Sequence, residues 1–209
     1  MKRFLSMFLV SAVIGLVAVP ADATLIDRGG GLIYDDDLNI TWLQDANYAS
    51  TSGYDADGAM EWPDAVTWAD TLVYGGYSDW RLPTLYDGSA DSTDFGYNIT
   101  SSEMGHLFYT ELGNNSSLTN TGPFTNLQVV TSYWSGTEYA LNPDLVWWFS
   151  FNDGYQRANH GVGNSMYVWA VRSGDSAAAS VPEPSTLLLL AAGFGGLLAT
   201  RKRLLNRKS

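Results

Sequence analysis

The segment LVWWFSFNDG, residues 145–154, contains the clearest strand pattern in the chain. Alternate side chains share one face of an extended segment, and here that face carries Leu145, Trp147, Phe149 and Phe151. The other face carries Val146, Trp148, Ser150 and Asn152. This alternation predicts a strand with one buried face, and Gly154 predicts a turn directly after it. We therefore expect the Trp147 face to fill a core and Trp148 to point away from it.

Short aromatic runs separated by Gly, Asn, Asp and Ser surround this segment and predict further strands and loops. Two of them are Gly31–Tyr34 and Ile40–Leu43. One helix should begin at Trp62, with Pro63 at the first helical position, and end before Gly75. A second should run from Ser101 or Ser102 to Gly113, with a buried stripe of Met104, Leu107, Phe108 and Leu112. The predicted fold class is α+β.

The two ends of the chain predict export. Lys2 and Arg3 precede an apolar run and an Ala21-Asp22-Ala23 site, which is typical of a signal peptide over residues 1–23 that is cleaved after Ala23. At the other end, residues 185–200 carry no charge and five basic residues follow them. This pattern predicts a short transmembrane helix with a cytoplasmic C-terminus, joined to the domain by a linker at 176–180.

Residues 181–209 resemble the PEP-CTERM sorting signal, because Pro182-Glu183-Pro184 precedes the hydrophobic span and the basic end. The resemblance implies secretion, transient anchoring in the inner membrane and removal of the tail by an exosortase, a membrane-embedded cysteine protease. The final location would be the cell surface or extracellular matrix of a Gram-negative bacterium that makes exopolysaccharide. The alternative is an ordinary membrane anchor that keeps its tail.

The composition of residues 24–180 narrows the choice of partners. This part has a net charge of −16, four arginines, no lysine and no cysteine. Nucleic acid is excluded as a partner, because phosphate binding depends on Lys and Arg. Cysteine-dependent catalysis is excluded as well. Divalent cations and neutral sugars remain the better candidates.

Four segments, GGYSDWRLPT (75–84), YWSGTEY (133–139), WWFSFNDG (147–154) and YVWAVRSG (167–174), together resemble the Lcl C-terminal domain. We assign this domain to residues 24–175. The resemblance implies a C-type-lectin-like fold, shared with formylglycine-generating enzymes: two helices packed on twisted antiparallel sheets, with the N- and C-terminal strands paired. We expect buried positions for Trp80, Leu82, Trp134, Trp147 and Trp169. Asp79 and Arg81 should clamp their own turn, and Gly136 should lie in a turn.

Oxygen-rich stretches make calcium a possible cofactor, because this ion prefers carboxylate, amide and carbonyl oxygens. One stretch holds Asp35, Asp36, Asp37 and Asn39, and a second holds Asp55, Asp57 and Glu61. The third is preferred, with Glu138, Asp144 and Asp153 as the metal ligands. It loosely resembles the calcium-binding loop of sugar-binding C-type lectins. His106 is interpreted as a packing or hydrogen-bonding residue and His160 as a solvated one.

The predicted function is non-enzymatic binding or organisation of extracellular polysaccharide. Sugar would stack on Tyr139 and Trp148 and form hydrogen bonds with Asn142 and Asn152. The negative charge argues against the sulfated glycosaminoglycans that the adhesin of the resembling family binds. Two alternatives remain open: a purely structural matrix protein, and a polysaccharide hydrolase that uses two of the carboxylates.

Overall fold

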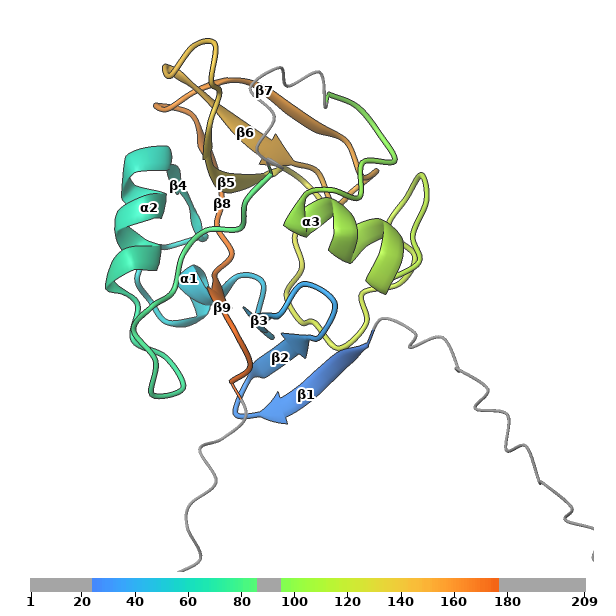
Figure 1. Cartoon of the computed structure of the whole chain (residues 1–209). Coiled ribbons are helices and arrows are strands. Elements are labelled where there is room, and N and C mark those ends of the chain that lie inside the picture. The colour runs from blue at the N-terminus through green and yellow to red at the C-terminus, as the bar shows by residue number, and fades with distance from the viewer. Residues whose placement is uncertain (1–23, 86–94, 177–209) are drawn as a thin grey trace, which may run out of the picture.

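The computed structural model describes residues 24–85 and 95–176 (Figure 1). The predicted signal peptide, the sorting signal and residues 177–180 of the linker lie outside this part of the chain. Within the described ranges, none of the helices is long and apolar enough to cross a membrane. The span predicted at residues 185–200 lies outside these ranges.

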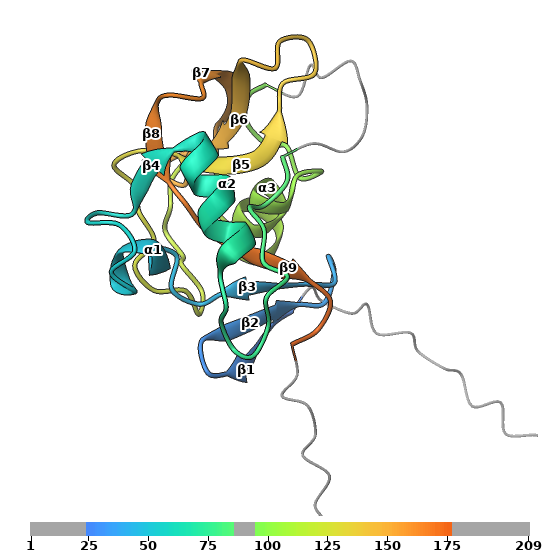
Figure 2. The ribbon, with the colours of Figure 1, turned by 90° about the vertical axis from the view of Figure 1, so that its left-hand side faces the viewer.

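The first sheet joins the beginning and the end of the domain. It has the order β1-β2-β3-β9, and all its pairs are antiparallel. The strands are β1 (Leu25–Gly29), β2 (Leu32–Asp35), β3 (Ile40–Leu43) and β9 (Val171–Ser173). Figure 2 shows β9, from the C-terminal end of the domain, lying beside β3. The expected pairing of N- and C-terminal strands is thus present, and the strands predicted near residues 31–34 and 40–43 are confirmed.

The second sheet holds the aromatic segments of the last third of the chain. Its order is β4-β8-β5-β6-β7, formed by β4 (Ala59–Glu61), β8 (Ser165–Tyr167), β5 (Tyr133–Glu138), β6 (Leu145–Phe149) and β7 (Gln156–Gly161). All pairs are antiparallel except β5 with β8, which run parallel where Tyr133 faces Tyr167. The prediction of a turn at Gly136 is wrong. Gly136 lies inside β5, where its N–H bonds the carbonyl of Pro83 at 2.9 Å.

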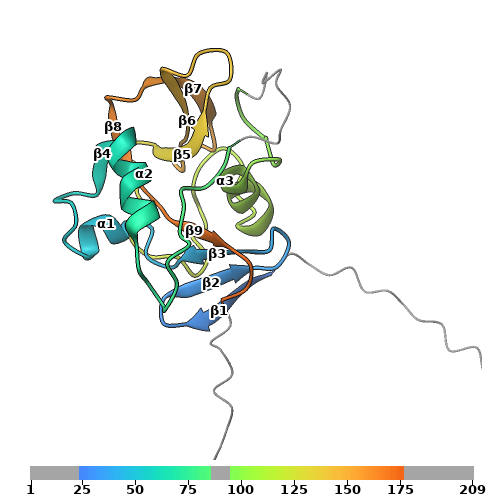
Figure 3. The same cartoon turned by 60° about the vertical axis from the view of Figure 1, so that its left-hand side comes forward.

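Helices occupy the space beside and between the two sheets (Figure 3). They are α1 (Tyr48–Thr51), α2 (Trp62–Thr71), α3 (Glu103–His106) and a π-helical turn, η1 (Leu107–Glu111). The start of α2 at Trp62 with Pro63 in its first turn is confirmed. Ser102 caps α3 by accepting a hydrogen bond from the Gly105 N–H at 3.1 Å, and the predicted apolar stripe is buried. The second helix differs in that its latter half is π-helical.

The core between the sheets is mainly aromatic. The predicted core residues Trp80, Leu82, Trp134, Trp147 and Trp169 are all buried. The ring of Trp169 lies 4.9 Å from the ring centroids of both Trp42 and Phe124. Edge-on and tilted contacts of this kind stabilise beyond the apolar area that they bury.

Asp79 and Arg81 were predicted to clamp their own turn, and only Arg81 does so, by donating from Nη1 to the Leu82 carbonyl at 3.1 Å. Asp79 forms a two-pronged ion pair with Arg172 of β9, with distances of 2.8 and 2.9 Å. Arg81 pairs with Glu103 at the start of α3, with distances of 2.8 and 2.6 Å. These two ion pairs therefore connect the loop that contains Asp79 and Arg81 to β9 and to α3.

The two faces of β6 largely follow the predicted alternation. Trp147, Phe149 and Phe151 are fully buried, whereas Trp148 is partly exposed. The first two residues invert the pattern, because Val146 is buried and Leu145 is partly exposed. This inversion occurs where the pairing of β6 with β7 shifts between Val146 and Trp147, and such a bulge bends and twists the strands locally.

Candidate functional site

Four rings form a continuous row on the outward side of β6 and β7, which we call the aromatic strip: Tyr97, Tyr155, Trp148 and His160. Successive ring centroids are separated by 4.9 Å, 5.8 Å and 5.4 Å. Tyr97 is 53% exposed, and the other three are partly exposed. His160 is therefore not a freely solvated loop residue as predicted. It lies on β7, edge-on to Trp148.

Hydrogen bonds hold the strip in place. The indole N–H of Trp148 donates to Asn159 Oδ1 at 2.9 Å, and the Tyr97 hydroxyl donates to Asp153 Oδ2 at 3.4 Å. The charge of Asp153 raises the pKa of the Tyr97 hydroxyl, so this group stays protonated and able to donate. Arg157 is exposed and lies directly opposite Trp148 on β7. The strip thus combines apolar rings with an amide, a carboxylate and a guanidinium.

Of the two aromatic residues predicted to stack on sugar, Trp148 lies in the strip and Tyr139 does not. Its ring lies 6.0 Å from that of Trp147 and 5.7 Å from that of Phe95. Trp147 and Trp148 are neighbours on an extended strand and project to opposite faces. Tyr139 and Trp148 therefore cannot hold the same sugar ring between them.

The two predicted sugar-binding amides are also separated. Asn142 lies in the connection from β5 to β6, where its Oδ1 accepts a hydrogen bond from the Asp144 N–H at 3.1 Å. Asn152 lies in the turn between β6 and β7 and is exposed. Because β6 separates these positions, only Asn152 lies at the end of β6 where Asp153 contacts the strip.

The predicted calcium ligands are divided in the same way. Glu138 is paired with Val146 near the start of β6, and Asp144 directly precedes that strand. Asp153 follows the other end of β6 and accepts a hydrogen bond from the Tyr155 N–H at 3.2 Å. In the described part of the chain, no group of potential metal ligands combines these three carboxylates. An extended strand between them prevents a shared ion.

The second acidic stretch forms a turn stabilised from within. Asp55 Oδ1 accepts hydrogen bonds from the backbone N–H groups of Asp57 and Gly58, at 3.0 and 2.8 Å. The bond from Gly58 lowers the pKa of Asp55. These contacts are those of a capped turn.

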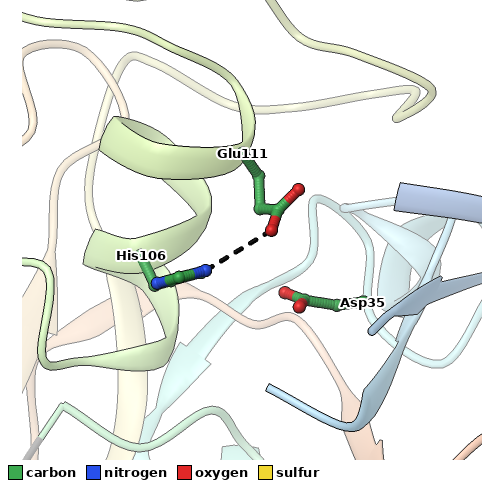
Figure 4. Close-up of side chains that lie close together, drawn as sticks. All are labelled: Asp35, His106 and Glu111. Atoms are coloured by element: carbon green, nitrogen blue, oxygen red, sulfur yellow. Dashed lines mark ion pairs between the residues drawn. The ribbon is translucent and has the colours of Figure 1, made fainter. Parts of the chain in front are cut away.

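A different set of potential ligands does come together: Asp35 at the end of β2, His106 at the end of α3 and Glu111 at the end of η1. One ligand atom from each lies within 4.8 Å of the others. Figure 4 shows all three side chains pointing toward one another. His106 Nε2 lies 3.4 Å from Glu111 Oε1 and 3.6 Å from Asp37 Oδ2. We call these three residues the acidic–histidine cluster.

The cluster is buried and incompletely paired. Asp35 is fully buried, and the side chain of Glu111 is 1% exposed. Burial raises the pKa of both carboxyl groups, because removal from water penalises the charged form. Glu111 Oε1 and His106 Nε2 make no hydrogen bond of acceptable geometry within the residues described. Buried polar atoms usually have partners, so these two require an explanation.

This cluster was not predicted from the sequence, because α-helical spacing was assumed throughout the second helix. His106 and Glu111 are five positions apart, and in an α-helix that spacing turns the second side chain well away from the first. The π-helical turn closes over one additional residue, and its Leu112 N–H bonds the Leu107 carbonyl at 2.9 Å. This wider turn places Glu111 beside His106.

Comparison with known families gives two matches. Residues 31–172 match the Lcl C-terminal domain, and residues 180–203 match the PEP-CTERM protein-sorting motif. A comparison with curated proteins gave no match. The residues predicted to direct processing, Ala23 and Pro182-Glu183-Pro184, lie outside the described part of the structure. The C-type-lectin-like detail of the fold stays a prediction.

These two matches indicate the domain family of the protein and how it is exported and processed. The sorting motif implies export, processing by exosortase during transient association with a membrane, and a final surface or extracellular location. The Lcl match covers both sheets from β2 to β9, and with them the aromatic strip and the acidic–histidine cluster. The chain therefore belongs to the Lcl C-terminal domain family.

Proposed function

We propose that this exported protein binds extracellular polysaccharide through the aromatic strip, as a non-enzymatic component of the cell surface or matrix. The observation that carries the proposal is the unbroken row of four partly exposed rings across β6 and β7. Tyr and Trp combine a large apolar surface with a polar group, which suits contacts that are partly wet. Successive rings are tilted against one another by 59°, 47° and 69°, so each offers its own apolar surface to a sugar unit.

Polar groups beside the strip favour a sugar over a purely apolar partner. Asn152, Arg157 and Asn159 are exposed, and each offers amide or guanidinium donors to hydroxyl groups. A small set of placed polar groups beside apolar rings is the usual composition of a ligand site. The charge of −16 over residues 24–180 opposes strongly anionic polymers and favours a neutral or weakly charged polysaccharide.

The test measures retention of the exported, processed protein on the exopolysaccharide of its own host. Tyr97→Ala is compared with Tyr54→Ala, because the two tyrosines are equally exposed, at 53% and 54%, and Tyr54 is outside the strip. Loss of one aromatic contact of about 0.5–1.5 kcal/mol weakens binding roughly 2- to 13-fold. We expect this loss for Tyr97→Ala and for Trp148→Ala, and none for Tyr54→Ala.

Two results would contradict the proposal. Equal retention of all three variants would show that the strip is not the binding surface. Absence of saturable binding by the unsubstituted protein would favour the purely structural matrix role. Shortening of the polysaccharide during the assay would instead indicate the hydrolase alternative.

A further inference from the structure

The acidic–histidine cluster holds two buried carboxyl groups, and little basic charge lies near them. Three of the four arginines in residues 24–180 are already paired with other acids: Arg28 with Asp175, Arg81 with Glu103 and Arg172 with Asp79. The fourth, Arg157, is exposed on β7. Within the described residues, His106 is the only cationic group at ion-pair distance from Glu111. A buried carboxylate with so little compensation is costly.

The unpartnered atoms point into the same space. Glu111 Oε1 and His106 Nε2 are both buried, both lack a hydrogen bond within the described ranges, and lie 3.4 Å apart. Figure 4 shows the Glu111 carboxylate directed toward the imidazole, with Asp35 facing both from β2. Within the described residues these two atoms thus contact each other as an ion pair that lacks hydrogen-bond geometry, and the Asp35 carboxylate faces them.

From these contacts we propose that Asp35, His106 and Glu111 bind one divalent transition-metal ion, with Zn²⁺ as the best fit, and that Asp37 is available as a fourth ligand. This site is separate from the aromatic strip and from the proposed glycan binding. It also differs from the calcium site predicted at Glu138, Asp144 and Asp153.

The spacing of the donor atoms suits such an ion. Ligands at about 2.0–2.2 Å from a tetrahedral centre lie about 3.3–3.6 Å from one another. The observed separations from His106 Nε2 are 3.4 Å to Glu111 and 3.6 Å to Asp37. An Asp35 carboxylate oxygen lies within 4.8 Å of the other two ligand atoms, so the His106 and Glu111 side chains must shift toward it to complete the site.

The types of donor select the class of metal. An imidazole nitrogen suits zinc and other transition metals, whereas calcium requires six to eight oxygen ligands. One imidazole with two or three carboxylates therefore favours Zn²⁺, with Mn²⁺ weaker in the general order of affinities. A bound ion would also neutralise the buried carboxylates and give the two unpartnered atoms a partner.

Existing hydrogen bonds orient Asp35 for this role. Its Oδ1 accepts from the Leu38 N–H at 2.9 Å, and its Oδ2 accepts from the Trp42 indole at 3.4 Å. Each carboxylate oxygen can accept more than one interaction, so lone pairs remain for a metal. Such outer contacts fix a ligand in place before the ion arrives.

The test titrates Zn²⁺, Mn²⁺ and Ca²⁺ separately into the exported, processed protein after chelator treatment, with calorimetry and metal analysis as readouts. We expect one Zn²⁺ per chain, bound more tightly than Mn²⁺, and no competition from millimolar Ca²⁺. Glu111→Gln and His106→Gln should weaken Zn²⁺ binding by more than the roughly 10- to 100-fold that loss of an outer-shell partner costs. Glu138→Gln removes the same charge from a residue outside the cluster and should leave affinity unchanged.

The unsubstituted protein alone can overturn the proposal. If it binds neither Zn²⁺ nor Mn²⁺ with a stoichiometry near one, the cluster is a histidine–carboxylate ion pair without a metal. Folding of Glu111→Gln and His106→Gln is checked by circular dichroism. If both folded variants bind Zn²⁺ with the original affinity, the ion binds outside the acidic–histidine cluster and the proposal is wrong. Glycan retention by the Glu111→Gln variant should persist, which separates this result from failure of the proposed function.

Discussion

Trp147 and Trp148 are adjacent residues with opposite environments. Trp147 is fully buried and stacks on Phe95, with a centroid distance of 4.8 Å and an interplanar angle of 20°. Trp148 is partly exposed and lies between Tyr155 and His160 in the aromatic strip. Trp147 therefore packs in the core, whereas Trp148 lies at the surface.

At this scale, Trp147→Ala should destabilise the domain by about 3–5 kcal/mol, because it empties a large buried site. Trp148→Ala should cost much less stability, since its ring keeps contact with solvent. Urea unfolding of both variants measures the difference. Equal, small losses in free energy of unfolding would contradict the facing of β6.

Among the elements, the loop at residues 81–84 is fixed by the start of α3. Glu103 accepts two hydrogen bonds from Arg81, and its Oε2 also accepts the Thr84 N–H at 2.7 Å. The Glu103 side chain is only 14% exposed, so its carboxylate is largely shielded from water, whereas the Arg81 side chain is 33% exposed. Because α3 carries His106 at its end, the same pair helps to position the acidic–histidine cluster.

Glu103→Gln should therefore lower the free energy of unfolding by about 1.5–3 kcal/mol, the range for hydrogen bonds to charged groups. Asp79→Asn is the matched control, because it breaks another two-pronged arginine pair at a side chain that is 56% exposed. Exposed pairs contribute about 0–1 kcal/mol, so its loss should be small. Chemical denaturation of both variants tests the ranking, and a larger loss for Asp79→Asn would contradict it.

Over the whole molecule, the two ends of the domain meet in the first sheet. β3 pairs with β9, and Arg28 forms an ion pair with Asp175 at 2.6 Å. β1 begins at Leu25, one residue after the first described residue, so the domain begins close to the predicted cleavage point after Ala23. Removal of both terminal segments would leave every strand of the two sheets in place.

Processing should therefore yield a stable extracellular form that begins at Thr24 and ends near Pro182-Glu183-Pro184. Intact-mass measurement of the protein recovered outside the cell gives both ends at once. A mature protein that still carries residues 201–209 would show an ordinary membrane anchor in place of exosortase processing.

Local patterns in the sequence determined much of the fold. The period-two alternation in residues 147–151, the Pro63 start of α2 and the buried stripe beginning at Met104 are all present in the structure. The sorting motif was equally readable, because its parts follow one another along the chain. Each of these features depends on residues that are close together in the sequence, so the sequence alone was enough to predict it.

The candidate sites depended on tertiary contacts. Asp35 and His106 are far apart in sequence and meet because the end of β2 lies near the end of α3, and Glu111 joins them only through the π-helical turn. Oxygen donors that are close in sequence, such as Asp144 and Asp153, are instead held apart by an extended strand. Proximity along the chain thus does not bring Asp144 and Asp153 together in space, because the direction of each side chain is set by the elements that pack around it.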